Sequence, residues 1–323
     1  MELKWQVLNI LSDGRFHSGQ KLAEQLGISR SAVWKIIHGW QASGMPVDAV
    51  TGRGYRLREA FVPYTLKRLQ TACSSVHWHF FEAVDSTNSF LLRNAPKQGM
   101  SVCLTEEQSQ GRGRRGRTWN STPGYSLTFS FAEWTSKPVS ELAWLPLIAG
   151  VAVSTALIGL GFENIGIKWP NDIVIKTDDG QWRKLAGMLM EVSGGLEGDV
   201  LWVLGIGLNV GLHALKNIEA EYPCGTLALQ KPDAACLRHE ILLAIIQSWQ
   251  HWVNLFWREG PSRIKRAWEQ FDVLAEQPVV VRTSENIYHG HAMGLDDFGR
   301  LVINTNGERR VLTAADVSIR AHP

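Results

Sequence analysis

GRGRRGR at residues 111–117, continued by TWNSTPG at residues 118–124, is the stretch that most restricts the fold. Its glycines have the spacing G-x-G-x-x-G, which binds dinucleotides only where it opens a helix after a strand. Residues 118–124 are loop-forming, and the segment lacks the G-K-[ST] ending of a P-loop. The sequence therefore predicts a flexible cationic loop, whose glycines allow close approach to a ligand and whose arginines neutralise phosphates. An alternative is a non-specific or nuclear-type nucleic-acid patch.

Short apolar runs alternate with helical stretches around this loop, which predicts a mixed α/β domain. The expected strands are residues 101–105, 125–131, 165–168, 172–175, 185–192 and 201–210. The expected helices are a long buried one at residues 140–160 and two amphipathic ones at residues 235–257 and 262–271.

Residues 142–162 carry no charged side chain and are numerous enough to span a membrane. Glycine, proline, serine and threonine dilute the hydropathy of this stretch, and acidic Glu141 and Glu163 flank it instead of lysine or arginine anchors. A helix buried against a sheet is the favoured interpretation, and a membrane span is the alternative.

The composition is that of a packed protein with two or three domains, since 45% of the 323 residues are apolar and 20% are charged. A net charge of +2 means that any nucleic-acid binding must come from local clusters. The four cysteines are far apart without a C-x-x-C pair, so we predict reduced thiols and no metal site. The N-terminus lacks a secretory pattern, and we expect a cytoplasmic protein with no membrane association.

The first 62 residues have the pattern of a winged helix-turn-helix. Ser18 and Ser29 are positioned to cap a second and a third helix. The third helix has an apolar inner face and a polar, partly cationic outer face. A glycine-bounded hairpin at residues 48–57 follows, and its arginines would meet phosphates as a wing. The candidate DNA-binding residues are Ser29, Arg30, Ser31, Trp34, Lys35, His38 and Arg53. An alternative is that this unit mediates only protein contacts.

The end of the chain contains short strand-like runs that predict a small β-barrel. These runs are residues 279–281, 286–293, 300–304 and 309–312. Asn306-Gly307 between the last two is a strong type I′ hairpin sequence.

Three polar sets lie near the ends of expected strands, where ligands bind in α/β sheets. They are STN at residues 86–88, KWPND at residues 168–172 and GIGLN at residues 205–209. Each alone is weak, because Ser86 caps an expected helix through Asn94, Lys168 has the features of a surface residue, and a Gly-x-Gly strand also marks close packing.

Together these residues resemble the bifunctional biotin-protein ligases of bacteria, in which a biotin operon repressor is fused to the enzyme. The resemblance covers nearly the whole chain. Its most specific elements are GRGRRG at residues 111–116 with Glu106, Gln108 and Trp119 around it, KWPND, KLAG at residues 184–187, and HSG and LGISR at residues 17–19 and 26–30. It implies a winged helix-turn-helix at residues 1–62, an α/β catalytic domain of the biotin/lipoate ligase type at residues 63–274, and an SH3-like β-barrel at residues 275–323.

The resemblance also implies a reaction. ATP, with Mg²⁺, would activate biotin to biotinyl-5′-AMP, and biotin would pass to a lysine of the biotin carboxyl carrier protein of acetyl-CoA carboxylase. A homodimer bound to biotinyl-5′-AMP would repress biotin synthesis genes at the biotin operator. No covalent nucleophile is needed, in agreement with the lack of a Ser-His-Asp or Cys-His constellation.

Residue roles follow from the same resemblance. The catalytic residues would be Lys168, Arg112, Arg114 and Arg115, which offset charge on the phosphoryl oxygens. The biotin-binding residues would be Ser86, Thr87, Asn88, Gln108, Arg112, Gly113, Arg114 and Lys168. The adenylate side would be bound by Trp119, Lys184 and Asn209. Asp172 would either orient Lys168 or help with metal.

Two alternatives stay open. A lipoate-protein ligase shares the core architecture but lacks the arginine-rich loop, the winged helix and the C-terminal barrel. A DNA-binding biotin sensor without transfer activity is the other. Trp34 on the outer face of the third helix is an unusual residue for base readout, which predicts a divergent operator or recognition through the wing and phosphates.

Overall fold

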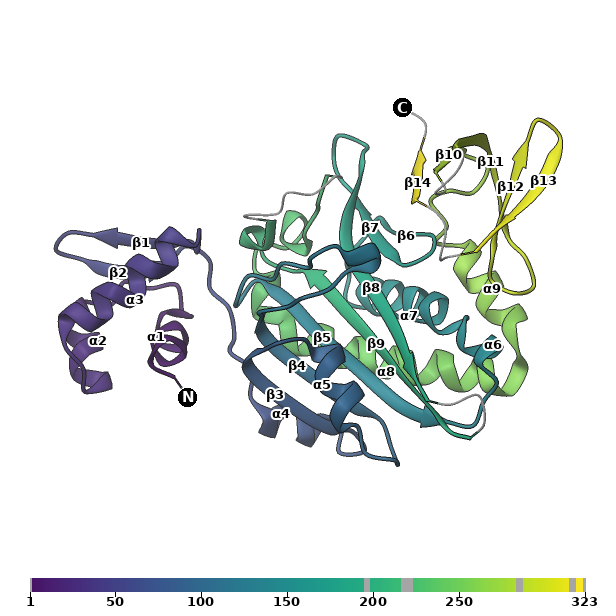
Figure 1. Cartoon of the computed structure of the whole chain (residues 1–323). Helices are drawn as coiled ribbons and strands as arrows, with labels where there is room; N and C mark the ends of the chain where they lie inside the picture. The colour runs from purple at the N-terminus through teal and green to yellow at the C-terminus, as the bar shows by residue number, and fades with distance from the viewer. Residues whose placement is uncertain (1, 195–197, 216–222, 283–286, 314–317, 322–323) are drawn as a thin grey trace.

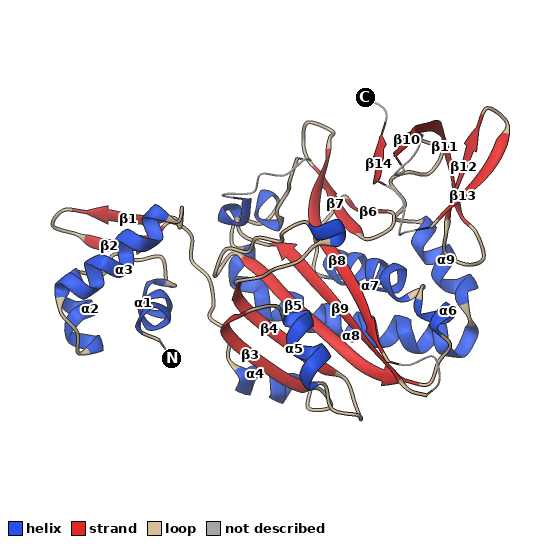
Figure 2. Cartoon of the chain, in the orientation of Figure 1, coloured by secondary structure: helices blue, strands red, loops and turns tan. Residues whose placement is uncertain are grey.

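A seven-stranded mixed sheet forms the centre of the protein, with helices on both faces (Figures 1 and 2). The computed structural model describes residues 2–194, 198–215, 223–282, 287–313 and 318–321. The strand order is β3-β4-β5-β9-β8-β7-β6. The strands are β3 (His77–Val84), β4 (Ser101–Gln108), β5 (Ser126–Thr135), β6 (Ile165–Lys168), β7 (Asp172–Lys176), β8 (Trp182–Ser193) and β9 (Val200–Asn209).

Six of these strands match the predicted ones, and β3 was not predicted. Only β3 and β4 are parallel, and every other neighbouring pair is antiparallel. β3 lies at an edge of the sheet, where it pairs on one side only, so its sequence HWHFFEAV tolerates polar residues that obscure a strand pattern. This strand leads directly into the first of the polar sets, STN.

Two long helices, α7 (Leu145–Gly159) and α8 (Arg238–Glu259), cover one face of the sheet, and α5 (Thr87–Asn94) packs on the other. The predicted single helix at residues 140–160 is in fact two, α6 (Val139–Leu142) and α7, with Pro146 in the first turn of α7. The remaining helices are α4 (Leu66–Ala72), α9 (Pro261–Glu269), and the 3-10 turns η1 (Arg114–Gly116), η2 (Leu212–Leu215), η3 (Leu227–Leu229) and η4 (Ala234–Leu237).

The stretch Val139–Gly159 is the one helical segment in the described residues that is apolar and long enough to cross a membrane. However, 72% of its most apolar window is buried within the protein. α7 packs against α8 and the sheet, and it is buried around most of its circumference. The interpretation as a core helix is therefore supported over that of a membrane span.

The N-terminal unit is a winged helix-turn-helix, as predicted. It contains α1 (Leu3–Leu11), α2 (Gly19–Leu26), α3 (Arg30–Ala42), β1 (Val47–Val50) and β2 (Gly54–Leu57). The hydroxyls of Ser18 and Ser29 accept the N–H groups of Lys21 and Ala32 and so cap α2 and α3. The unit has its own apolar core.

A small antiparallel sheet ends the chain, with the strand order β13-β12-β11-β10-β14. Its strands are β10 (Pro278–Arg282), β11 (Ile287–Leu295), β12 (Leu301–Thr305), β13 (Glu308–Leu312) and β14 (Ser318–Ala321). Asn306 and Gly307 both have positive φ, 53° and 89°, which confirms the predicted type I′ hairpin. β14 was not predicted, and Asn286 of a predicted strand lies outside the described residues.

Candidate functional site

A cleft of about 760 Å³ opens beside the arginine loop, residues 111–117. Its walls come from this loop and the residues before it, the start of α7, the hairpin between β6 and β7, and β8. The lining residues are residues 109–118, Pro146, Pro170, Asn171 and residues 188–191. Four predicted residues line the cleft, namely Arg112, Gly113, Arg114 and Arg115. The other predicted ligand-binding residues are not among the lining residues: Ser86, Thr87, Asn88, Gln108, Trp119, Lys168, Lys184 and Asn209.

The arginine loop is folded back on itself. The Gly113 N–H donates to the Arg117 carbonyl at 2.7 Å, and the Trp119 N–H donates to the Gly111 carbonyl at 2.9 Å. Arg115 lies at the turn with φ of 58° and is exposed. The loop therefore presents charged groups from a closed backbone hairpin.

Arg114 ties this loop to the KWPND hairpin. Its guanidinium Nη1 donates to Asn171 Oδ1 at 2.9 Å, and Asn171 Nδ2 donates to the Met188 carbonyl at 2.7 Å. Burial lowers the pKa of Arg114, although nearby Asp172 opposes this effect. One wall of the cleft is thus held across three segments that are distant in the sequence.

A buried polar network adjoins the cleft at the start of α5. Gln108 Oε1 accepts the backbone N–H of Thr87 at 2.8 Å and its hydroxyl at 3.1 Å. Ser130 Oγ links the Thr87 hydroxyl, at 2.6 Å, to Asn88 Oδ1, also at 2.6 Å. Asn88 Nδ2 donates to Glu191 Oε2 at 2.8 Å. Ser86 stands apart as the N-cap of α5, where its hydroxyl accepts the Ser89 N–H.

Glu191 joins this network to the arginine loop, because Arg112 Nη2 donates to the same carboxylate oxygen at 2.9 Å. Ser130 and Glu191 were missed by sequence reasoning. The signal that marks them is a polar residue inside an otherwise apolar strand, TFSFAEW for Ser130 and LAGMLMEV for Glu191. Such residues in a buried strand need a polar partner.

Trp119 lies across the glycines of β8 and β9. A Cβ added to Gly207 would come within 2.1 Å of the Trp119 ring, so only glycine permits this approach. Trp119 Nε1 and Asn209 Oδ1 are buried and have no hydrogen-bond partner among the described residues. Asn209 Nδ2 donates to the Gly225 carbonyl at 3.1 Å. Two unpaired polar atoms therefore remain on this side of the site.

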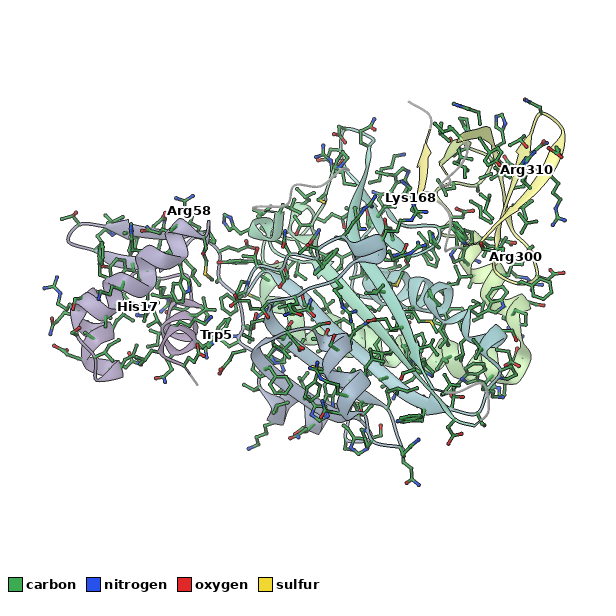
Figure 3. All side chains as sticks on the ribbon, in the orientation of Figure 1. Trp5, His17, Arg58, Lys168, Arg300 and Arg310 are labelled. Carbon is green, nitrogen blue, oxygen red and sulfur yellow. The ribbon has the colours of Figure 1, made fainter. Side chains whose placement is uncertain are left out.

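Lysines lie at the β6 and β8 ends of the site. Lys168, labelled in Figure 3, is the last residue of β6 and is paired in register with Asp172 of β7. The Asp172 carboxylate forms an ion pair with Lys184 Nζ at 2.8 Å. This ion pair is with Lys184, so it bears out neither of the two roles considered for Asp172, the orientation of Lys168 and help with a metal.

The described residues contain no group of three or more His, Cys, Asp or Glu side chains suited to a metal ion. The carboxylates nearest the cleft, Asp172 and Glu191, are already paired with Lys184 and Arg112. All four cysteines are free thiols, as expected.

The seven candidate DNA-binding residues are all exposed. Trp34 is 53% exposed, and its ring stacks on that of His38 with centroids 4.9 Å apart. Arg53 lies over the Phe16 ring at 4.1 Å in the turn of the wing. Arg56, the other wing arginine, pairs with Asp48 at 3.1 Å. Arg53 is therefore the wing arginine better placed for a phosphate.

Known proteins match every part of the chain. The HTH domain model matches residues 5–56, the Biotin/lipoate A/B protein ligase family matches residues 80–209, and the Biotin protein ligase C terminal domain matches residues 275–320. The bifunctional ligase/repressor BirA of Salmonella typhimurium is 30% identical, over 98% of this chain and 97% of that protein. The protein of the same name from Bacillus subtilis is 29% identical over 94% of both chains. Biotin protein ligase from Aquifex aeolicus in complex with biotin and ATP has a TM-score of 0.64 and 26% identity, over 76% of this chain and 99% of that one.

Proposed function

Because the chain belongs to the bifunctional ligase/repressor family of biotin-protein ligases, we propose that it activates biotin with ATP in the cleft beside the arginine loop. It is a ligase that acts with biotin and ATP, and its helix-turn-helix makes it a DNA-binding repressor. One observation carries the location. Arginines of the loop line the cleft together with Glu191, and Glu191 links Arg112 to the buried polar network through Asn88.

The polar network suits the ureido ring of biotin, which carries two N–H donors and one carbonyl acceptor. Thr87, Asn88 and Gln108 offer hydroxyl and amide groups for these hydrogen bonds. Thr87 and Asn88 are each only 3% exposed. These groups are satisfied by one another through Ser130, so binding exchanges hydrogen bonds and leaves no polar group unpaired. Ser86 contributes by capping α5 and so holding this set in place.

The nucleotide belongs on the opposite side, over β8 and β9. The buried, unpaired Trp119 Nε1 and Asn209 Oδ1 are a donor and an acceptor for a ligand there. The Trp119 ring offers a stacking surface for adenine, and Lys184 offers a positive charge. We assign to Lys168, the last residue of β6, the role of holding the carboxylate of biotin against the α-phosphate.

In the first step a biotin carboxylate oxygen attacks the α-phosphorus of MgATP, the bond between the α-phosphorus and the α,β-bridging oxygen breaks, and the β- and γ-phosphates leave as pyrophosphate. Arg112, Arg114, Arg115 and Lys168 stabilise the negative charge that develops on the phosphoryl oxygens. In the second step the uncharged ε-amine of an acceptor lysine attacks the acyl carbon of biotinyl-5′-AMP, AMP leaves, and the amine loses its proton. The acceptor is the biotin carboxyl carrier protein of acetyl-CoA carboxylase.

The repressor activity would reside in residues 1–62, ahead of a ligase domain at residues 63–274 and a C-terminal domain at residues 275–323. We place Ser29, Arg30, Ser31, Trp34, Lys35, His38 and Arg53 on operator DNA of biotin synthesis genes, since all are exposed on one unit. A homodimer that forms with biotinyl-5′-AMP would bind the operator, and the protein would work in the cytoplasm.

The test is biotin transfer to a purified acceptor domain with ATP and Mg²⁺, run on the wild type, Lys168→Ala and a matched control, Lys176→Ala. Lys176 ends β7, the neighbour of β6, and is exposed. We expect transfer by the wild type and the control, and its loss in Lys168→Ala. Tight biotin binding without pyrophosphate release by the wild type would instead identify a DNA-binding sensor, and preferred use of lipoate would identify a lipoate ligase.

A further inference from the structure

A buried hydrogen bond joins the hairpin that carries Lys168 to the C-terminal sheet. The indole Nε1 of Trp169 donates to the Gly299 carbonyl at 3.2 Å across 130 positions of sequence. Trp169 is 3% exposed and follows Lys168 directly. Lys168 and Arg300, both labelled in Figure 3, are the sequence neighbours of Trp169 and Gly299. The position of the lysine is thus coupled to a distant turn.

That turn, residues 296–300, is held rigidly by Asp296. One oxygen of the Asp296 carboxylate accepts the N–H groups of Phe298 and Arg300, both at 2.9 Å. The other accepts Arg300 Nε at 2.8 Å. Asp296 is 9% exposed, so these bonds are sheltered from water. The Gly299 carbonyl is therefore presented in a fixed direction.

The same turn presses on the start of α7, which also borders the cleft. A Cβ added to Gly299 would come within 2.6 Å of Leu147 Cδ1 and 3.5 Å of the Trp144 ring. Leu147 is next to Pro146, a cleft-lining residue, and is itself buried. Gly299 has φ of 74°, so glycine is needed both for the turn and for this close contact. The turn therefore contacts Leu147 and Trp169, the sequence neighbours of two cleft-lining residues, Pro146 and Pro170.

We infer that Trp169 is a positioning residue for the ligase reaction. Its hydrogen bond to the turn 296–300 fixes the position of the adjacent Lys168. This inference rests on the proposed function of Lys168. The C-terminal sheet holds the end of β6 in place through the Trp169 indole, so the lysine meets the reacting oxygens without reorganising. Trp169 is not among the residues that line the cleft, so we assign it no contact with substrate.

The experiment measures pyrophosphate release from biotin and MgATP by the full-length Trp169→Phe variant, together with its KM for biotin and its melting temperature. Phenylalanine keeps an aromatic ring but lacks the N–H donor and part of the volume of the indole. Trp78→Phe is the matched control, because Trp78 is also buried and its indole donates to the Cys73 carbonyl at 2.9 Å, at the opposite edge of the sheet. We expect kcat to fall about fivefold in Trp169→Phe, as the loss of one hydrogen bond predicts. Its KM for biotin stays the same, and Trp78→Phe keeps the wild-type kcat.

A second pair of variants guards against misfolding. Gly299→Ala and Gly307→Ala both place a side chain at positive φ in a turn of the C-terminal sheet, but a Cβ at Gly307 meets nothing within 4 Å. We expect only Gly299→Ala to slow adenylate formation. If the wild type is active but Trp169→Phe is as fast as Trp78→Phe, and Gly299→Ala as fast as Gly307→Ala, the positioning role is overturned. An inactive wild type would instead refute the proposed function.

Discussion

Replacing Arg238 with methionine removes one half of a fully buried ion pair. Arg238 is 0% exposed, and its two terminal nitrogens bind the Glu106 carboxylate oxygens at 2.8 and 2.9 Å. It also donates to the Val62 carbonyl, where the chain leaves the winged helix. Glu106 in turn accepts the Gly124 N–H at 2.9 Å, beyond the arginine loop. The pair therefore joins the DNA-binding unit, α8 and the base of the loop.

The expected loss follows from the burial of both charges. Burial alone lowers the pKa of Arg238, but the adjacent Glu106 carboxylate outweighs this and raises the pKa above its usual value, so Arg238 is charged at any working pH. In Arg238→Met the carboxylate of Glu106, 5% exposed, is left without its countercharge. Removing one partner of such a pair costs about 3–5 kcal/mol. That is a large part of the roughly 5–15 kcal/mol that stabilises a domain.

Urea unfolding followed by tryptophan fluorescence measures this loss, with Arg68→Met as the matched control. Arg68 of α4 pairs with Glu240, which lies in α8 as Arg238 does. This pair is exposed and should contribute about 1 kcal/mol or less. The double variant Glu106→Gln with Arg238→Met removes both charges and should recover part of the stability. If Arg238→Met destabilised the protein no more than Arg68→Met, the argument from buried charge would be refuted.

Three further predictions concern biotin, DNA and pH. Asn88→Asp places a second carboxylate against Glu191 and should raise the KM for biotin at least about tenfold. The control Asn94→Asp, at an exposed position of the same helix, should leave the KM unchanged. Equal KM values for the two variants would exclude Asn88 from the site. Arg53→Ala should weaken operator binding and reduce the slope of log K against log salt by about 1, and an unchanged slope in a salt titration would mean no phosphate contact. Burial raises the pKa of Asp272 to about 6 from 3.8, so its stabilising contribution is lost as pH rises through 6. At pH 7 the free energy of unfolding of Asp272→Asn, measured by urea titration, should therefore exceed that of the wild type by about 1–3 kcal/mol. This difference should disappear below pH 4.

The N-terminal unit and the last hairpin follow from the sequence because their causes are local. Ser18 and Ser29 cap helices within three residues of themselves, and Asn306-Gly307 adopts the positive φ values that its hairpin requires. The arginine loop was recognisable in the same way, since its composition and the loop residues after it are contiguous. Such features depend on backbone preferences that neighbouring residues decide.

The polar network at α5 depends on tertiary structure. The STN motif and Gln108 were found from the sequence, but Ser130 and Glu191 complete the network from β5 and β8, 42 and 103 positions away from Asn88. β3 was overlooked for a related reason, because an edge strand carries a weak pattern and is defined by its partner β4. Hydrogen bonds between strands have no sequence spacing that would reveal them.

The two contacts that matter most to our predictions were equally invisible in the sequence. Arg238 belongs to a predicted amphipathic helix, where an arginine is ordinarily solvated, and Trp169 is one aromatic residue in a recognised motif. Only the folded chain brings Glu106 to the first and the Gly299 carbonyl to the second. The sequence by itself determined the capped helices of the N-terminal unit, the last hairpin and the motif residues, whose energies are local. The tertiary structure decided which charges and donors are removed from water, and therefore which of them must be paired.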